Sequence, residues 1–525
     1  MGLLFKIARS EEEMEQIHKL NYRTFVEEIP QHPKSDTERR VDPFHAENTY
    51  LICLKNKQLI GMIAVRDKRP FSIDKKIGPV EDHLPFQAHL LCEIRLLAVD
   101  AKNRNGRVFL GLSQLLANYC IKQGYDAAVI SGTTRQTKLY TQLGFTVFHD
   151  PVGTEDAQFH PMYITRDTFE KQVSSRIGIS SSRFMPGPIM VADDVTKALM
   201  SPPISHRSKA FLTLFNSVKE KLLRLTKAAN CQLLLGSGTL ANEVIAMQLK
   251  KLSNGVIFIN GEFGKRLQGH AIRAGLSFES YEIPWGTSFT LQEIKEVINK
   301  HNPEWIWFTH CETSTGVLNS LDDMQKACME KSIKICLDAI SSIGARPINL
   351  SNIYLASGVS GKALGSYSGL SIVFHQHYMK KDETIPGYLD LGWYIENDGV
   401  PFTHSSNLIS ALHQSLEAYE EEQPFERIGR QYLYIRENLE SHGIHVLSKI
   451  EHSCPTIMTI PFPTKIPSTF IGEDMEMNGY LLHYESAYLK HNNWVQISPI
   501  SNIEEKETQR MLSQLKELVT YYQSQ

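Results

Sequence analysis

Short apolar runs alternate with helical patterns along the first third of the chain. Thr49–Asn56 and Leu59–Val65 are apolar segments that flank a polar turn, which predicts a β-hairpin. Cys92–Asp100 predicts a further strand, and the apolar positions of Val108–Gly124 recur at helical spacing. Asp126–Gly132 adds another strand. We therefore expect a mixed α/β domain here.

The rest of the chain repeats a different unit. Four short runs rich in β-branched and aromatic residues alternate with helical patterns, at 254–261, 304–310, 333–340 and 368–375. Such alternation is typical of βαβ units around a mainly parallel sheet. Within the 525 residues, we predict an N-terminal domain at 1–168, a serine-rich linker at 169–182, a large domain at 183–388 and a small α+β lobe at 389–525.

Composition narrows the class of protein. Hydrophobic residues make up 42% and charged residues 22%, with a formal net charge of −3, so we expect a folded protein that does not bind nucleic acid. We found no apolar run of about 18 residues that could span a bilayer. The eight cysteines lie apart without CxxC pairs, which argues against a zinc site or a disulfide framework. We expect a cytoplasmic protein with no metal.

One lysine suggests chemistry. Lys362 lies in the segment SGVSGKALG, between Ser360, Gly361 and Gly365. Small neighbours allow a bulky cofactor to approach the backbone, and a buried lysine can form an imine with an aldehyde. By itself, a lysine among small residues is more often part of a solvated turn.

Three further segments change that balance. The turn at Gly236–Thr239 separates a strand from a helix, and free N–H groups at a helix start can hold a phosphate. Asp338 ends an apolar strand, where a carboxylate needs a cation such as a protonated pyridine nitrogen. Phe308–Gly316 is dense in hydrogen-bonding side chains. Each also has a plain structural interpretation as a turn, a helix cap or an ion pair.

The order of these segments resembles the class V aminotransferases, a fold type I family that uses pyridoxal 5′-phosphate (PLP). The resemblance covers residues 183–525 and is carried by MPGP, PPISHRSKAF, GSGTLANE, NGEFGKR, THCETSTG, LDAISSIG and SGVSGK. It is greatest with the alanine–glyoxylate, serine–pyruvate and 2-aminoethylphosphonate–pyruvate branch. It implies amino transfer between a small-molecule amino donor and an oxo acid, in a homodimer.

The resemblance also implies roles for individual residues. Lys362 would hold PLP as a Schiff base and move the proton, and Asp338 would hold the pyridinium. The remaining cofactor contacts would be Ser237, Gly238, Thr239 and Ser360 at the phosphate, Phe263 on the ring, Thr313 at the ring hydroxyl, and Thr403 reaching the phosphate of the neighbouring subunit. For Phe263 and Thr403, roles as a core aromatic and a capping residue remain open.

One position departs from the family. Members that act on α-amino acids commonly have an arginine on a late strand, where this chain has Gln496. A neutral amide gives up a charge-assisted pair with a carboxylate. Either the carboxylate binds elsewhere or the donor is not an ordinary α-amino acid; the other candidates are His206, Arg207, Lys490 and His491.

Residues 5–165 resemble the GNAT acyltransferases, near the autoinducer and N-acyl amino acid synthases. The resemblance is carried by EIRLLAVDAKNRNGRVFLGLSQLL and KLYTQLGFTVF. The pyrophosphate loop keeps Arg104 and Gly106 but has Arg107 and Phe109 near positions where the family has glycine or alanine. We therefore expect acyl-CoA or an acyl carrier protein as donor, or no catalysis. Tyr140 is a candidate catalytic acid or a core tyrosine.

The sequence as a whole predicts a bifunctional enzyme. In this interpretation a class V aminotransferase, with Lys362 as its central residue, is fused to a GNAT-like N-acyltransferase. The alternative is a PLP-dependent lyase or desulfurase whose N-terminal domain is a non-catalytic binding or dimerisation module. A desulfurase would need a mobile cysteine nucleophile, for which Cys454 is the candidate.

Overall fold

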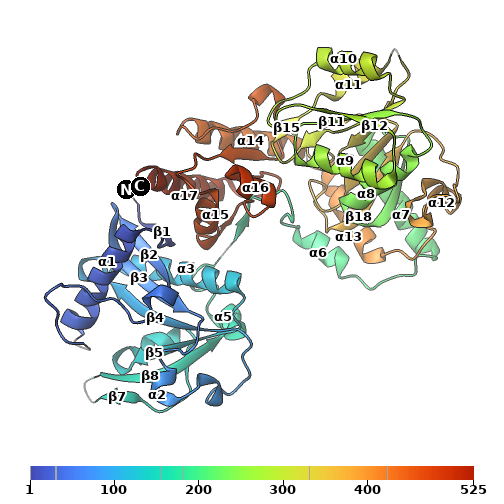
Figure 1. Ribbon diagram of the computed structural model, residues 1–525. Helices are drawn as coiled ribbons and strands as arrows, with labels where there is room; N and C mark the ends of the chain where they lie inside the picture. Colours follow the sequence, from blue (N-terminus) through green and yellow to red (C-terminus); the bar gives the residue numbers. More distant parts are fainter. Residues whose placement is uncertain (1, 30–31, 155–156, 180, 330, 422–423) are drawn as a thin grey trace. The chain divides into compact units, whose positions relative to one another are not determined.

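The computed structural model describes residues 2–29, 32–154, 157–179, 181–329, 331–421 and 424–525, and it divides into two compact units (Figure 1). Unit 1 consists of Met1–Ser182 with two segments from the end of the chain, Phe470–Leu481 and Ser513–Gln525. Unit 2 consists of Arg183–Thr469 and Leu482–Leu512. Our prediction placed all of 389–525 in the small lobe, so the two C-terminal segments of unit 1 differ from it.

Unit 1 is built on a mixed sheet in the order β1-β2-β3-β4-β5-β8-β6, with β7 (Val152–Thr154) beside β8. The predicted hairpin is present as an antiparallel pair. The strands predicted at 92–100 and 126–132 and the helix predicted at 108–124 are also present, as β4, β5 and α3, and β1, β6 and β8 complete the sheet. The bounds are β1 Leu4–Ile7, β2 Thr49–Lys55, β3 Gln58–Arg66, β4 Leu91–Val99, α3 Arg107–Gln123, β5 Ala127–Thr133, β6 Thr146–Val147 and β8 Ala157–Thr165.

The strands β4 and β5 separate soon after they meet. They pair in parallel only between Leu91–Glu93 and Ala127–Val129. Beyond these residues β4 and β5 make no backbone pairing with each other, so the sheet is open between them. The helix α3 packs on one face of the same sheet and buries Val108 and Leu112 there.

The segment predicted as a linker is more ordered than its serine content suggested. The helix α5 (Arg166–Gln172) continues into it, and two apolar residues beyond the helix, Val173 and Ile177, are buried in the core of unit 1. The serine-rich composition of the segment did not reveal these two buried residues, because two isolated apolar positions form no periodic pattern. The unit boundary falls at Ser182.

Unit 2 contains a seven-stranded sheet in the order β10-β18-β17-β16-β13-β11-β12. Neighbouring strands from β12 to β17 are parallel, whereas β18 is antiparallel to both of its neighbours. The prediction of a mainly parallel sheet is confirmed. The bounds are β10 Asn230–Gly236, β11 Gly255–Ile259, β12 Phe278–Glu282, β13 Trp305–Thr309, β16 Lys334–Asp338, β17 Leu355–Val359 and β18 Gly369–His375.

Helices cover both faces of this sheet. Alternate residues of β13 point to opposite sides, so that Ile306 and Phe308 lie in one apolar cluster and Trp305 and Trp307 in another. The first cluster packs against α7 (Lys209–Thr226), α10 (Leu291–His301), α11 (Leu321–Met329) and α13 (Ser406–Glu421), and the second against α8 (Gly238–Leu249) and α9 (Glu262–Ala274). The result is a three-layered α/β unit.

The remaining C-terminal elements form a smaller α+β region. A two-stranded antiparallel sheet joins β19 (Met458–Pro461) to β21 (Trp494–Ile497). The apolar stretch at 442–449 is a turn and irregular chain. Its helices are α14 (Pro424–Glu440), α15 (Ser468–Met477), α16 (Ala487–Asn492) and α17 (Glu505–Gln523).

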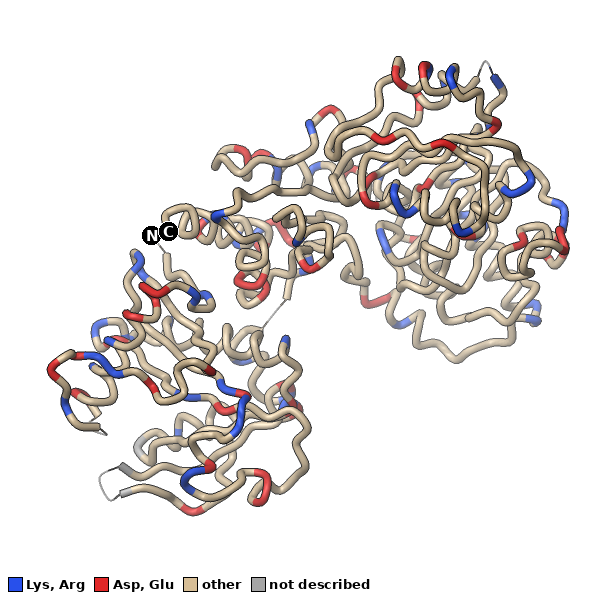
Figure 2. Tube along the Cα trace, in the orientation of Figure 1, with Lys and Arg blue, Asp and Glu red and all other residues tan. Residues whose placement is uncertain are grey.

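Charged side chains of both signs are interspersed along the trace of each unit (Figure 2). No helix in the described ranges is both long and apolar enough to cross a membrane. Within those ranges, no group of three or more His, Cys, Asp or Glu side chains could hold a metal ion. All eight cysteines are free thiols.

Candidate functional sites

A cavity of about 330 Å³ lies at the carboxyl ends of the central strands of unit 2. The parallel strands β13, β16 and β17 end there with Thr309, Asp338 and Val359, all of which line it. Ligands of open α/β sheets bind at this edge because the strand ends leave a crevice between the loops that follow. The cavity also receives the start of α8, at Ser237, and Lys362.

Lys362 reaches the cavity from the loop after β17. Its Nζ donates to Ser341 Oγ at 2.7 Å. Burial lowers the pKa of this amine from its usual value, while Asp338 acts in the opposite direction. A lowered pKa leaves more of the amine neutral and nucleophilic near neutral pH.

Asp338 is the anionic group of the cavity and is only 5% exposed. Its oxygens accept from neutral donors, Asn242 Nδ2 at 2.9 Å and the Ile340 N–H at 3.0 Å. Burial raises the pKa of this carboxyl, and the Asn242 bond opposes the rise. A buried carboxylate held by neutral groups gains stability from a cation placed beside it.

The start of α8 provides an anion site. Ser237 is its N-cap residue and makes no side-chain capping bond, so Gly238 and Thr239 begin a helix whose first N–H groups are not capped by that side chain. All three line the cavity. The positive end of the helix dipole and these N–H groups suit a phosphate.

An aromatic ring and a close backbone approach complete the cavity. Phe263 and Thr313 line it, and Lys362 Nζ lies 5.6 Å from the centre of the Phe263 ring. A side chain at Gly361 would approach the backbone of Ser368 to 2.8 Å, so only glycine fits before the lysine. The buried acid, the amine, the ring and the anion site fit the pyridine nitrogen, aldehyde, ring and phosphate of PLP.

Two predicted cofactor contacts lie outside this cavity lining. The Ser360 hydroxyl donates to the Tyr367 carbonyl at 2.6 Å and accepts from the Leu370 N–H at 3.3 Å, so it holds the loop. Thr403 is exposed on the surface of unit 2. The other predicted residues of unit 2 are brought together.

Several lining residues were missed by sequence reasoning. Asn242 follows the phosphate turn by one helical turn and faces Asp338, which periodicity could have suggested. Ser341 lies three residues after Asp338 and meets Lys362. Arg266 and His270 come from α9, one turn apart. No local pattern marked these two, because a surface helix normally carries such residues.

Gln496 is committed to the protein itself. Its Nε2 donates to the Thr313 and Ser314 carbonyls and to Thr459 Oγ1, at 2.6, 3.1 and 2.8 Å. Its Oε1 is bonded to His483 Nδ1 at 2.9 Å and accepts from the Tyr488 hydroxyl at 3.2 Å. With the residue wholly buried, this amide holds two strands and a helix together.

Cys454 is deeply buried and fixed. Its sulfur lies 3.1 Å from Thr456 Oγ1, and the sulfur of Cys311 lies 3.3 Å from the same oxygen. Its N–H donates to the Gly316 carbonyl at 2.9 Å. A desulfurase nucleophile must travel to its substrate, which this packing opposes.

Unit 1 contains a second cavity, of about 570 Å³, beside the point where β4 and β5 part. Tyr140 and Phe109 line it, and the Tyr140 hydroxyl is 3.5 Å from Gln136 Oε1. Burial raises the pKa of Tyr140, so the phenol is a proton donor at neutral pH. Arg107, in contrast, is exposed at the start of α3.

Two charged residues of β4, Glu93 and Arg95, form a polar wall of this cavity. Neither was predicted from the sequence. Glu93 is 1% exposed and accepts from the Ser72 N–H at 2.8 Å, from the Ser72 hydroxyl and from the Ile73 N–H at 3.1 Å. Arg95, two residues on, pairs with both oxygens of Asp42 at 2.8 and 3.1 Å. The spacing places Glu93 and Arg95 on one face of β4, and this alternation was the available signal.

An apolar cavity adjoins this cleft, because the two share Ile94, Ser113, Leu116, Leu143 and Phe145. Its other lining residues are mostly hydrophobic, among them Ala117 and Ile121 of α3, Phe169 of α5 and Val173, which follows α5. A polar cleft that continues into an apolar one suits a molecule with a polar head and an aliphatic tail.

Fold and cavity together define unit 2 as a fold type I transferase of the PLP-dependent kind. Residues 196–384 match the family model of the class V aminotransferases, and residues 16–164 match that of the N-acyl amino acid synthase FeeM. The chain is therefore a fusion of an N-acyltransferase-like region with a class V aminotransferase region.

Individual relatives agree with this assignment. An uncharacterized aminotransferase of Methanocaldococcus jannaschii is 28% identical over 57% of this chain and 80% of its own. A 2-aminoethylphosphonate–pyruvate transaminase of Pseudomonas putida is 26% identical over 57% and 86%. The solved alanine–glyoxylate aminotransferase of Nostoc sp. is similar with a TM-score of 0.60 and 25% identity, covering 65% of this chain and 95% of its own.

Proposed function

We propose that the chain transfers an amino group at the cavity of unit 2 and an acyl group at the cleft of unit 1. The observation that carries the first activity is the convergence of Lys362 and Asp338 on one cavity at the start of α8. Bound PLP supplies an aldehyde that condenses with an amine and a ring that accepts electrons from the substrate carbon. The residues around it bind, orient and exchange protons.

Each residue has a separate task in this proposal. Lys362 holds the cofactor and, when released, carries the proton to and from the substrate carbon. Asp338 keeps the ring nitrogen protonated, because a buried carboxylate favours a neighbouring cation. Phe263 covers the ring, Thr313 lies near the ring hydroxyl, and Ser237, Gly238 and Thr239 hold the phosphate.

The acid group of the substrates requires a cation, and Gln496, a neutral amide bonded within the protein, does not supply one. Arg207, one earlier candidate, donates to the Val400 carbonyl at 3.0 Å. Arg266 lines the cavity and has a side chain that is 54% exposed beside Glu262. We assign the carboxylate or phosphonate of the donor and of the oxo acid to Arg266.

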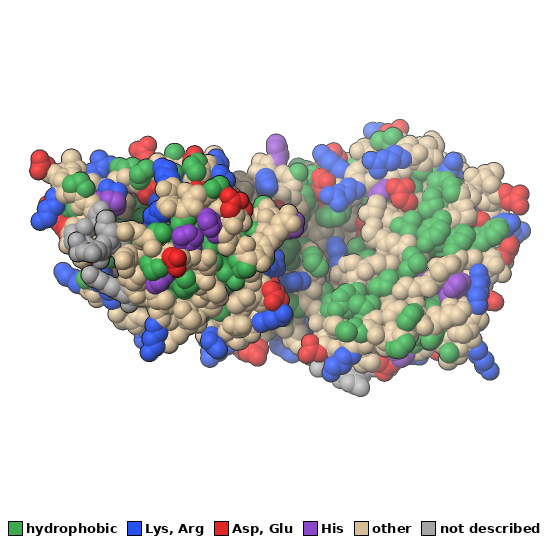
Figure 3. All heavy atoms as spheres, turned by 90° about the horizontal axis from the view of Figure 1, so that it is seen from below, with side chains coloured by type: hydrophobic (Ala, Val, Ile, Leu, Met, Phe, Trp, Pro, Cys, Tyr) green, Lys and Arg blue, Asp and Glu red, His purple; other side chains and the backbone are tan. Residues whose placement is uncertain are grey.

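A homodimer fits the position of Thr403. This threonine is exposed, and a copy of the chain would bring it to the phosphate of its partner. Hydrophobic side chains gather on the face of unit 2 seen in Figure 3. Exposed residues near α6 (Asp193–Leu199), namely Met190, Met200 and Ile204, are suited to such an interface.

At unit 1 we assign the amine to the polar wall and the acyl chain to the apolar cavity. Glu93 takes the proton of the attacking amine, and Tyr140 protonates the departing thiolate. Arg95 orients the acceptor. The donor is a fatty acyl thioester of coenzyme A or of an acyl carrier protein. The free thiols of the chain suit a reducing cytoplasm.

Two assays test the two activities. PLP-loaded protein is mixed with single amino donors, and transfer is followed as loss of the aldehyde form of the cofactor and its recovery on adding an oxo acid. Unit 1 is tested in the full chain with lauroyl-CoA and lauroyl-acyl carrier protein and a panel of amino acids. A donor that converts the cofactor but yields no matching carbonyl compound would contradict transamination, and release of ammonia instead would indicate a lyase.

A further inference from the structure

The two segments from the end of the chain lie on the free edge of the unit 1 sheet. The strand β1 is the first of that sheet and pairs only with β2 on its other side. An edge strand exposes unpaired N–H and C=O groups. The Ile7 N–H donates to Asp474 Oδ1 at 3.1 Å, and the Phe5 carbonyl accepts from Asn478 Nδ2 at 2.9 Å.

These contacts use both kinds of edge group. Asp474 and Asn478 are four residues apart, so they lie on one face of the helical segment at the end of α15. One side chain accepts from the strand and the other donates to it. The helix segment therefore takes the place of a further strand.

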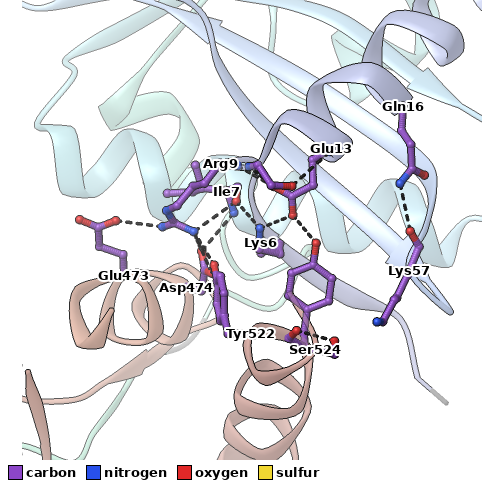
Figure 4. Close-up of polar contacts among 12 residues, drawn as sticks. Lys6, Ile7, Arg9, Glu13, Gln16, Lys57, Glu473, Asp474, Tyr522 and Ser524 are labelled. Carbon is purple, nitrogen blue, oxygen red and sulfur yellow. Dashed lines mark hydrogen bonds and ion pairs between the residues drawn. The ribbon is translucent and has the colours of Figure 1, made fainter. Parts of the chain in front are cut away.

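A buried charged group secures this contact (Figure 4). Arg9 Nη1 lies 2.9 Å from both oxygens of Asp474, whose side chain is 0% exposed. The Tyr522 hydroxyl donates to Asp474 Oδ2 at 2.6 Å, and the Arg9 guanidinium covers the Phe470 ring at 4.5 Å. Asp474 raises the pKa of Arg9 above its usual value, against the effect of burial.

The last turn of α17 adds a second buried group. The Tyr521 hydroxyl donates to Glu13 Oε1 at 2.6 Å, and Lys6 Nζ lies 2.5 Å from the same oxygen. Lys6 also lies 5.1 Å from the Tyr521 ring centre. Because Glu13 completes the capping box of α1 (Glu11–Tyr22), the chain terminus supports the start of that helix.

The segment 470–481 also contacts α3. Asn118 Nδ2 donates to the Met477 carbonyl at 2.8 Å, and Lys122 pairs with Glu476. Other residues of α3, including Phe109, Ser113 and Leu116, line the cleft of unit 1. Because α3 contacts the segment 470–481 on one face and lines the cleft with another, a shift of that segment would shift the residues of α3 that line the cleft.

We propose that residues 470–481 and 513–525 are positioning elements of the acyl-transfer cleft, which they fix through β1 and α3. The N-terminal unit then depends on two segments from the C-terminal part of the chain, one before and one after Leu482–Leu512 of unit 2. This inference rests on the proposed acyl-transfer function in one respect, which is the use of lauroyl-CoA as the ligand in the second experiment below.

The first experiment measures amide hydrogen exchange in β1 and α3 of the PLP-loaded full chain. Asp474→Asn removes the buried charge beside Arg9 and is expected to speed exchange about a hundredfold, as for a broken buried pair. Glu473→Gln is the control, since Glu473 also bonds Arg9, at 2.9 Å, but its side chain is 40% exposed. Its effect should stay below about fivefold.

The second experiment uses a milder change. Asn118→Ala removes only the bond to Met477 and should weaken lauroyl-CoA binding and raise its KM without an equal fall in kcat. Gln123→Ala, at an exposed position of α3, should leave both unchanged. Unchanged exchange in both Asp474→Asn and Asn118→Ala would overturn the proposal. If the wild type itself does not bind lauroyl-CoA, the assigned substrate is wrong, while the exchange result still decides the positioning role.

Discussion

Among single residues, we expect amino transfer to depend on the charge of Asp338, which we propose to lie beside the ring nitrogen of the cofactor. Asp338→Asn keeps the size and the Asn242 contact but removes the anion. We expect amino transfer to fall by about 10- to 100-fold, the loss expected for a charge-assisted bond, with the cofactor still attached. Steady-state rates measure this, and Asp322→Asn, an exposed acid on α11, is the control. Equal rates in Asp338→Asn and wild type would mean that this carboxylate does not face the ring.

Burial at Lys362 predicts a pH dependence. Since burial lowers its pKa from the ordinary 10.5, the neutral amine persists to lower pH than in a free lysine. The rate at which the apo-protein captures PLP should therefore rise with pH and reach its half-maximum below pH 10.5. Absorbance measured after mixing over a pH series tests this. A half-maximum at the ordinary lysine value would show that the amine is solvated.

At the scale of elements, the loop before Lys362 depends on a missing side chain. In Gly361→Ala, the new Cβ would meet the backbone of Ser368, which cannot rotate away as a side chain can. We expect a loss of about 1–3 kcal/mol in the stability of unit 2, the usual cost of overpacking, and weaker PLP binding. Thermal unfolding and PLP titration measure the two effects.

The control for Gly361→Ala is the same substitution at a glycine that lies inside a helix. Gly269 of α9 has open space where a Cβ would be placed. Gly269→Ala should raise stability by up to about 1 kcal/mol, because alanine favours a helix interior. If both substitutions behaved alike, close packing at Gly361 would not be the cause of its effect.

Periodicity predicted the elements, but only partly the residues of each site. Strand ends and a turn before a helix are local features, so Asp338, Ser237 and Lys362 could be predicted. Arg266 and His270 reach the cavity only because α9 packs beside α8, which no local pattern reveals. Ser360 was assigned to the phosphate by resemblance, yet its hydroxyl is bonded within its own loop.

At the scale of the whole molecule, two separate units predict two responses to ligand. We propose that PLP binds unit 2 alone, so at about 100 times its Kd it should stabilise that unit by about 2.7 kcal/mol and leave unit 1 unchanged. Calorimetry with and without PLP should show one of two transitions shifting. A single transition that moves as a whole would mean that the units unfold together.

Domain limits were the hardest feature to predict from the sequence. The segments 470–481 and 513–525 follow the aminotransferase motifs in the chain, yet they complete unit 1. Their signals are single residues such as Asp474 and Tyr522, whose partners lie more than 400 residues away. Contacts of this kind have no period and no motif.

We propose that Lys362 carries the cofactor, and borohydride reduction of the bound cofactor decides whether it does. Reduction of the PLP-loaded protein should fix the cofactor covalently, and peptide mapping should find it on Lys362. Lys362→Ala should retain no fixed cofactor and no amino transfer. Cofactor fixed on another lysine of the wild type, or a Lys362→Ala protein that still transfers amino groups, would show that Lys362 is not the attachment point.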